Sequence, residues 1–238
     1  MSNFVQGFLD NDSFFGKFMT KLGIIIGANL MFVLCSIPFV TVGAGLVGLY
    51  HVMLKTLRGD GVVNPFKEFW IGFKNNFKQA TISWLIFVVL AVALYFDLKI
   101  CNAAGGMFAT FKYGVYALVA ILVVSFCFLL PTMAAFADTI PHLIRNGWFF
   151  CCRRPFQSLV MLFFDVFPLY LTYTDMRMLP LYAFLWCMLG FGAIAMLGST
   201  LLLKQFNEFL PKDEEDVVYD PTDDEDKMLE DLRMMDGL

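Results

Sequence analysis

The stretch LGIIIGANLMFVLCSIPFVTVGAGLVGLY, residues 22–50, decides the class of fold. Its first part, residues 22–37, is a run of 16 nearly uncharged residues. Such a run is too long for a β-strand and is typical of a helix in a membrane. Pro38 then removes a backbone donor, so we expect the first span to end there. A second, differently oriented helical segment should follow.

The glycines of this stretch imitate a nucleotide-binding motif. Gly43, Gly45 and Gly48 have the G-x-G-x-x-G spacing of a phosphate-binding turn. That motif needs a strand before the glycines, whereas the run before them predicts a helix. We therefore interpret the small residues as positions of close helix packing, because Ala44 and Gly48 have the spacing that lets membrane helices approach each other.

The composition of the whole chain also indicates a membrane protein. The 238 residues are 59% apolar and 17% aromatic, with a mean hydropathy of +0.69, whereas soluble domains are about 45–50% apolar. Four further stretches are long enough to cross a hydrocarbon core of about 30 Å. The predicted spans are about 22–37, 80–96, 113–130, 157–174 and 179–203.

The predicted fold class is therefore all-α, a polytopic membrane protein with five transmembrane helices. Residues 1–210 form the membrane domain. We expect the helices to break at Pro38 and again at Pro131, and we assign Thr41, three residues after Pro38, to the first break.

Two connections predict amphipathic helices that lie on the inner leaflet. After Pro38, apolar residues recur at helical spacing through Leu57, while His51, Lys55 and Arg58 share the opposite face. A second segment begins at Asn64-Pro-Phe66 and combines aromatic with basic residues, which suit the headgroup region. Its interfacial residues are Phe66, Trp70, Phe73, Lys74, Asn76, Phe77 and Lys78.

Charge predicts the orientation. The connections after the first, third and fifth spans hold 12 Lys and Arg, and the other side holds 5. Because cytoplasmic loops carry the excess of basic residues, we expect the N-terminus outside and the C-terminus in the cytoplasm. Residues 211–238 form an acidic cytoplasmic tail with 12 acidic and 3 basic residues, so no nucleic-acid partner is expected. A docked amphipathic helix and a solvated segment are both compatible with this tail.

Asp165 is the foremost candidate for a functional side chain, since it lies near the middle of the fourth span. A carboxylate at the bilayer centre costs about 2.5–3.5 kcal/mol. Two interpretations fit: a proton or ligand contact in a polar path, or an acid whose hydrogen bond locks helices together.

A second polar group follows Pro131. Asp138, His142 and Arg145 have the i, i+4, i+7 spacing that makes them neighbours on one helix face. Asp138 could orient His142 as a base, and interfacial solvation explains the same three residues without a function.

Classical catalytic and metal-binding patterns are missing from the sequence. The six cysteines form no C-x-x-C pair and only two histidines occur, so we expect no metal and no cofactor. The chain also lacks H-E-x-x-H, G-x-S-x-G and a P-loop, so we assign no catalytic residue and do not expect an enzyme.

Several blocks resemble the signature of the YesL-like family, which consists of bacterial integral-membrane proteins of unknown function. They are Asn29, Ile37-Pro-Phe-Val-Thr41-Val-Gly43-Ala-Gly45, Leu49-Tyr50 and Phe73-Lys-Asn-Asn76-Phe77-Lys-Gln79-Ala80-Thr81. The resemblance covers about residues 10–210 and departs at Gly45 and Gly48, where alanine is expected. It implies a multi-pass protein of the bacterial plasma membrane whose gene lies near those of sugar permeases and glycoside hydrolases.

These features together predict a non-enzymatic accessory membrane protein associated with the uptake of carbohydrate, as oligosaccharide or glycan. Its expected partners are membrane lipids and another membrane protein, for which a sugar ABC permease is the leading candidate. The alternative is a small transporter or channel with a polar path near Asp165, and a membrane enzyme ranks third. None of these hypotheses fixes the oligomeric state.

Overall fold

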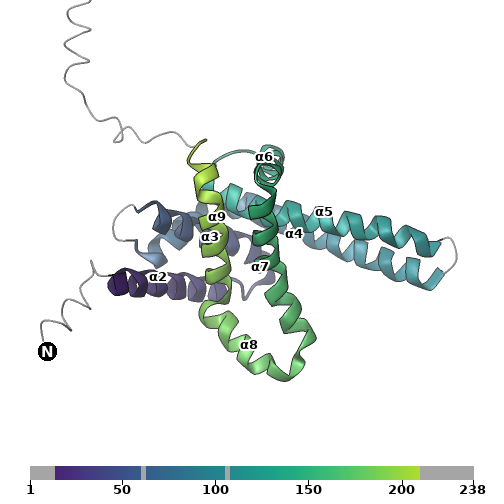
Figure 1. Ribbon diagram of the computed structural model, residues 1–238, viewed down its shortest axis with the longest axis horizontal. Coiled ribbons are helices and arrows are strands. Elements are labelled where there is room, and N and C mark those ends of the chain that lie inside the picture. The colour runs from purple at the N-terminus through teal and green to yellow at the C-terminus, as the bar shows by residue number, and fades with distance from the viewer. Residues whose placement is uncertain (1–13, 60–62, 105–107, 210–238) are drawn as a thin grey trace, which may run out of the picture. The chain divides into compact units, whose positions relative to one another are not determined.

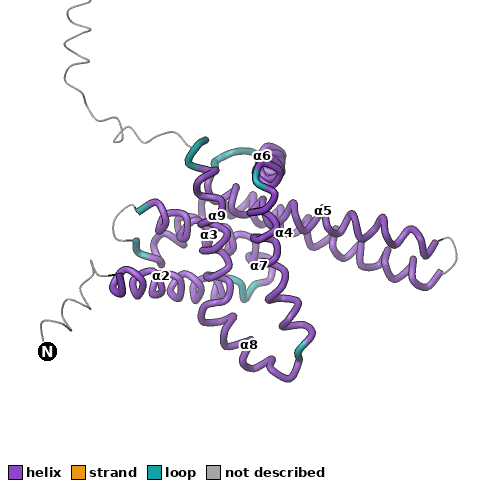
Figure 2. The backbone as a smooth tube through the Cα atoms, in the orientation of Figure 1, coloured by secondary structure: helices purple, strands orange, loops and turns teal. Residues whose placement is uncertain are grey.

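A computed structural model of the chain describes residues 14–59, 63–104 and 108–209. Within these ranges the chain forms helices and short connections, and no strand (Figure 2). The all-α prediction is therefore confirmed. The elements are α2 (Phe14–Cys35), η1 (Phe39–Thr41), α3 (Val42–Arg58), α4 (Pro65–Ala104), α5 (Phe108–Ala135), α6 (Ile140–Arg153), α7 (Pro155–Thr174), η2 (Met176–Met178), α8 (Leu179–Leu185), the π-helical turn η3 (Trp186–Gly190) and α9 (Phe191–Phe206).

Contacts divide the chain into a unit Met1–Phe206 and a unit Asn207–Leu238. All the described helices belong to the first unit. The predicted acidic tail, residues 211–238, lies outside the described residues.

Six described helices are long and apolar enough to cross a membrane, one more than the five predicted. The additional one comprises η1 and α3, Phe39–Arg58, which the sequence assigned to an interfacial helix. Eleven of the 17 residues of α3 are buried, on several sides of the helix. It packs against α2, α4, α5 and α9 (Figure 1), so α3 is a core helix and not an amphipathic segment lying on lipid.

The segment after Asn64 also differs from the prediction. Instead of an interfacial helix followed by a separate span at 80–96, α4 is one helix of 40 residues. The Asn64 side chain accepts hydrogen bonds from the backbone amides of Phe66 and Lys67, which caps the helix start. No proline follows Pro65 in α4, so nothing in the sequence ends the helix before residue 104.

The predicted break at Pro131 is wrong, because α5 continues through Pro131 to Ala135. The next residue adds side-chain hydrogen bonds to this turn of the helix. The Thr132 hydroxyl bonds the carbonyls of Phe128 and Leu129 at 2.9 and 2.8 Å, whereas the carbonyl that loses its amide donor to Pro131 is that of Cys127. Pro168 likewise stays inside α7, with the Thr172 hydroxyl bonded to its carbonyl at 2.8 Å.

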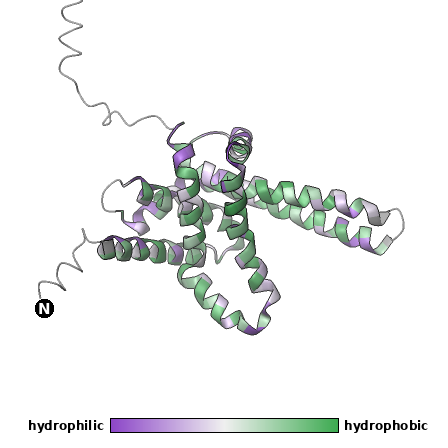
Figure 3. Ribbon diagram, viewed as in Figure 1, coloured by the Kyte–Doolittle hydropathy of each residue, from purple (hydrophilic) through white to green (hydrophobic). Residues whose placement is uncertain are grey.

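The helices α4 and α5 run side by side as a long hairpin (Figure 1). Most of this hairpin is hydrophobic (Figure 3), and large apolar side chains such as Val89, Phe96 and Ile121 are exposed along it. In water such a surface would cause aggregation, whereas in a bilayer it contacts lipid tails or another membrane helix.

Candidate functional site

The break after α2 positions the start of α3. The helix α2 ends at Cys35, and the Thr41 hydroxyl donates to the carbonyls of Cys35 and Pro38. Trp84 of α4 donates from its indole nitrogen to the Phe39 carbonyl at 2.9 Å. Carbonyls on both sides of the break at Pro38 are thereby bonded inside the protein, as a membrane requires.

Small residues let α3 approach α4 and α2 closely. A Cβ added to Gly43 would lie 2.5 Å from the Trp84 Cβ and 2.6 Å from the Ala80 carbonyl oxygen. One added to Gly48 would lie 3.0 Å from the Phe69 carbonyl oxygen, and one added to Gly45 would meet the Phe32 ring at 3.0 Å. The three glycines with G-x-G-x-x-G spacing are thus positions where helices pack closely.

Asn29 joins α2 to the last span. Its side-chain nitrogen donates to the carbonyls of Trp186 and Cys187 at 2.9 and 2.7 Å, and its oxygen accepts from the Gly192 amide at 2.8 Å. These backbone groups belong to the π-helical turn and to the first residues of α9, where the regular hydrogen-bond ladder is interrupted. The fully buried Asn29 satisfies them from another helix.

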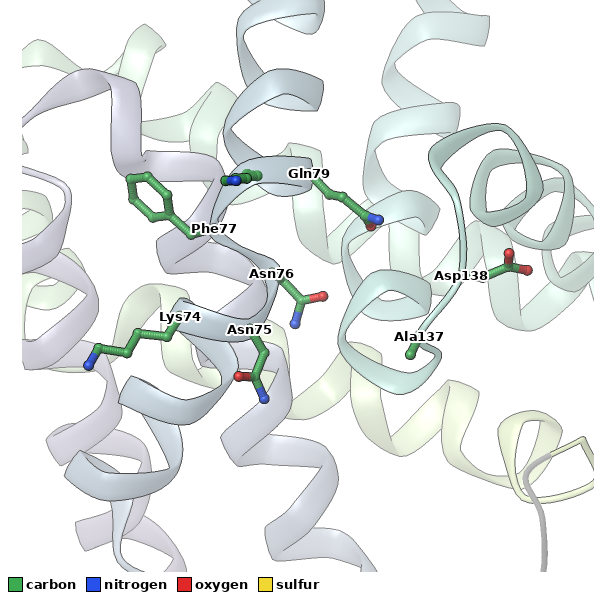
Figure 4. Close-up of a pocket in the computed structure, with 8 residues that line it drawn as sticks. Lys74, Asn75, Asn76, Phe77, Gln79, Ala137 and Asp138 are labelled. Atoms are coloured by element: carbon green, nitrogen blue, oxygen red, sulfur yellow. The ribbon is translucent and has the colours of Figure 1, made fainter.

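A polar pocket of about 680 Å³ lies where α4 faces the connection between α5 and α6. In Figure 4, Asn76 and Gln79 extend from α4 toward the segment with Ala137 and Asp138. Lys74 and Phe77 extend to the other side of α4. The pocket is lined by Lys74, Asn75, Asn76, Phe77, Lys78, Gln79, Ala137 and Asp138.

The pocket therefore presents the side-chain amides of Asn76 and Gln79 toward the segment with Ala137 and Asp138. Asn76 uses its nitrogen to bond the Gly72 carbonyl at 3.1 Å, while Asn75 and Lys78 are exposed. Amides offer both donors and acceptors, so such a pocket suits a polar loop or a hydroxyl-rich ligand.

The aromatic part of the predicted interfacial set divides into two groups. Phe73 is buried and stacks with Trp70 at a centroid distance of 5.5 Å. Phe66, Trp70 and Phe77 are exposed, and Lys74 lies over the Trp70 ring at 5.2 Å. Only the exposed rings are therefore available to lipid headgroups.

The sequence predicted that Asp138, His142 and Arg145 share one helix face, and in the structure they do not. Residues 136–139 are not helical, and α6 begins after them with Pro141 in its first turn. Asp138 Oδ1 accepts from the Thr139 amide at 2.6 Å and lies 3.2 Å from His142 Nδ1. Both of these bonds lower the pKa of the Asp138 carboxyl, the Thr139 amide being the larger cause. His142 and Arg145 are exposed and Asp138 is partly exposed, so they form no enclosed catalytic group.

One charged cluster was not predicted from the sequence. Glu68 is nearly buried, and its Oε2 lies 3.1 Å from Lys55 Nζ and 3.6 Å from His51 Nε2. The contact with Lys55 is an ion pair and not a well-aligned hydrogen bond. The signal was present, since His51 and Lys55 are four residues apart on α3 and Glu68 is the one acid in the first turn of α4.

A second cavity, of about 710 Å³, reaches Asp165. Side chains from α2, α3, α4, α5, α7, η3 and α9 converge on it, together with Ser36 and Ile37. Its polar lining atoms are few, and its aromatic lining residues are Phe32, Tyr50, Trp84, Phe87, Phe126, Trp186 and Phe191. We call this site the Asp165 cavity.

Asp165 has one bonded and one unbonded oxygen in this cavity. The Cys127 thiol hydrogen-bonds to its carboxylate. Its Oδ2 is buried and has no hydrogen-bond partner among the described residues. The interpretation of Asp165 as an acid that only joins helices by its hydrogen bonds therefore does not account for this oxygen.

The remaining reactive groups are dispersed. The six cysteines are all free thiols, and within the described ranges no three His, Cys, Asp or Glu side chains are grouped so that they could hold a metal ion.

Exposed apolar helices and internally bonded helix breaks define a multi-pass, all-α membrane protein. Residues 25–98 match the family model DUF624, which is described as a protein of unknown function. This is the YesL-like domain, so the resemblance is confirmed over the second half of α2, all of α3 and most of α4. Searches of curated proteins and of solved structures found no match.

Proposed function

We propose that this chain is a non-enzymatic accessory protein of the bacterial plasma membrane that assists carbohydrate uptake by binding a sugar ABC permease. The excess of Lys and Arg in alternate connections supports an outside N-terminus and a cytoplasmic C-terminus for five crossings, in which α3 packs inside the bundle without crossing the bilayer; a sixth crossing would put both ends on one side. The carbohydrate connection is supported by the resemblance to the YesL-like proteins.

The observation that carries this proposal is the polar pocket beside α4. The stretch Lys74–Gln79, which supplies six of its eight lining residues, lies inside the segment that matches the family model. Lipid tails offer no partners for amide groups, whereas a polar loop of a neighbouring protein offers both donors and acceptors. The exposed apolar hairpin of α4 and α5 adds a surface on which membrane helices can pack.

A crosslinking experiment tests the partner. A photoreactive amino acid replaces Asn75, and the crosslinked products from native membranes are identified by mass spectrometry. Permease subunits are the expected product. The same substitution at Asn102, an exposed asparagine near the far end of α4, is the matched control and should give no such product. Recovery of the bait alone from both positions would count against the proposal.

The Asp165 cavity favours a second candidate, a small transporter or channel. Vesicles that contain the purified chain and labelled oligosaccharide would show protein-dependent flux, and Asp165→Asn should reduce it. This candidate ranks second because sugar hydroxyls need polar partners, and the lining of the Asp165 cavity is mainly apolar. Unchanged flux in Asp165→Asn would remove Asp165 from the transport path.

A further inference from the structure

The Asp165 cavity has an uneven distribution of charge. Its lining includes one carboxylate, Asp165, and no lysine, arginine or histidine among the described residues. The other polar side chains of the lining are neutral: Ser36, Tyr50, Cys127, Cys187 and the two tryptophans. The cavity thus offers one carboxyl group and no positive group from the protein that could pair with it.

The polar groups around the cavity leave acceptors open. Besides the unbonded Oδ2 of Asp165, the Ser36 hydroxyl oxygen is buried and lacks a hydrogen-bond partner. The Cys127 thiol is a weak donor and satisfies only part of the carboxylate. A ligand with a donor or a positive charge would complete this arrangement.

The aromatic rings add attraction for the same kind of ligand. Trp84, Phe87 and Phe126 form one cluster, with centroid distances of 5.6 Å from Phe126 to Trp84 and 4.1 Å from Phe126 to Phe87. Trp186 and Phe191 form another at 4.6 Å. Aromatic faces attract cations, most strongly where water is excluded, and rings together with a carboxylate are the usual surroundings of an organic ammonium group.

The size and opening of the cavity suit a molecule that arrives from the bilayer. A volume of about 710 Å³ is within the usual range for small-molecule sites. Ile37, Val166 and Leu169 line the cavity and are also exposed, so the cavity reaches the surface of the helical unit through apolar residues. Lipid-soluble molecules can approach such an opening without crossing a polar barrier.

We propose that the Asp165 cavity binds a membrane-soluble organic cation, with its positive group beside the Asp165 carboxylate and its apolar body among the aromatic rings. Binding at this site requires neither the permease partner nor sugar flux, so it stands or falls independently of the function proposed above.

A pair of probes with matched shape and opposite charge tests this proposal. The full chain is reconstituted in lipid nanodiscs, and binding of tetraphenylphosphonium and tetraphenylborate is measured by equilibrium dialysis against empty nanodiscs. The cation should bind saturably and the anion should not. Asp165→Asn should weaken cation binding by about tenfold or more, because a charge pair away from water is lost.

Two further variants separate charge from folding. Asp97→Asn removes a carboxylate from an exposed position of α4 and should leave binding unchanged. Val123→Trp fills part of the cavity without changing charge, and it should weaken binding even if Asp165→Asn fails to fold. Equal binding of both probes, or tight cation binding that survives both Asp165→Asn and Val123→Trp, would overturn the proposal.

Discussion

Asn29 in α2 and Gly192 at the start of α9 are joined by a 2.8 Å hydrogen bond from the Gly192 amide to the Asn29 side-chain oxygen. The two residues are separated by 163 positions in the sequence. The helices also touch directly, since a Cβ on Gly192 would lie 2.8 Å from Ile25 Cγ2. This pair therefore fixes where the first span meets the last.

Asn29→Leu should destabilise the protein by about 1–3 kcal/mol, because it leaves the Trp186 and Cys187 carbonyls and the Gly192 amide without partners. Thermal unfolding in a mild detergent measures the loss. Asn102→Leu changes the same residue type at an exposed place in α4 and serves as the control. If both variants unfolded at the temperature of the original protein, the Asn29 bonds would contribute no stability.

Gly43→Ala should also destabilise, by about 1–3 kcal/mol, since the added methyl group collides with the backbone of α4. Gly114→Ala is the matched control, because a Cβ at Gly114 has no other atom within 4 Å. Alanine is the better helix former, so this control should be neutral or more stable by up to about 1 kcal/mol. Equal unfolding temperatures for the two variants would contradict the close contact of α3 and α4.

The ion pair of Lys55 and Glu68 should show measurable coupling. A double-mutant cycle with Lys55→Met and Glu68→Gln isolates the pair, and we expect a coupling free energy of about 1 kcal/mol, because Glu68 is nearly buried while Lys55 is partly exposed. Chemical unfolding of the four proteins provides the values. Strictly additive effects would show that the two charges do not stabilise the contact between α3 and α4.

Asp138 predicts a pH dependence with a defined sign. Its pKa is held below the ordinary value of 3.8, mainly by the Thr139 amide, so the ionised form stabilises the fold. This contribution is complete above pH 3.8 and disappears as the pH falls through the lower, folded pKa. The difference in unfolding temperature between the original protein and Asp138→Asn should therefore be constant near neutral pH and shrink only below about pH 4. A difference that changed between pH 5 and 7 would point to another group.

The sequence was sufficient for the class of fold and insufficient for the position of α3. Apolar and basic residues on opposite sides of α3 are equally compatible with a lipid surface and with a helical core. The choice depends on whether neighbours can come close, and Gly43 and Gly48 permit that only because Ala80 and Phe69 face them in α4. Close packing of this kind depends on residues in two segments at once, so no pattern within one segment predicts it.

The same limit applies to the sites. Asp165 was found from its charge in an apolar run, but its cavity needs side chains from α2 to α9, which no local pattern brings together. Pro131 was misjudged because a membrane helix packed against its neighbours can continue through a proline, and the sequence of α5 alone does not show those neighbours. Asn29 was visible only as part of the family signature, since its partners lie more than 150 residues away.

The unbroken α4 helix has a mechanical consequence. At about 1.5 Å per residue its 40 residues extend for about 60 Å, roughly twice the hydrocarbon thickness. Because no proline breaks α4, a change of tilt in its lipid-facing part is passed along the helix, and helices tilt when a bilayer thins. A change in the tilt of the hairpin of α4 and α5 therefore also displaces Asn75, Asn76 and Gln79. Membrane thickness thus affects the geometry of the polar pocket.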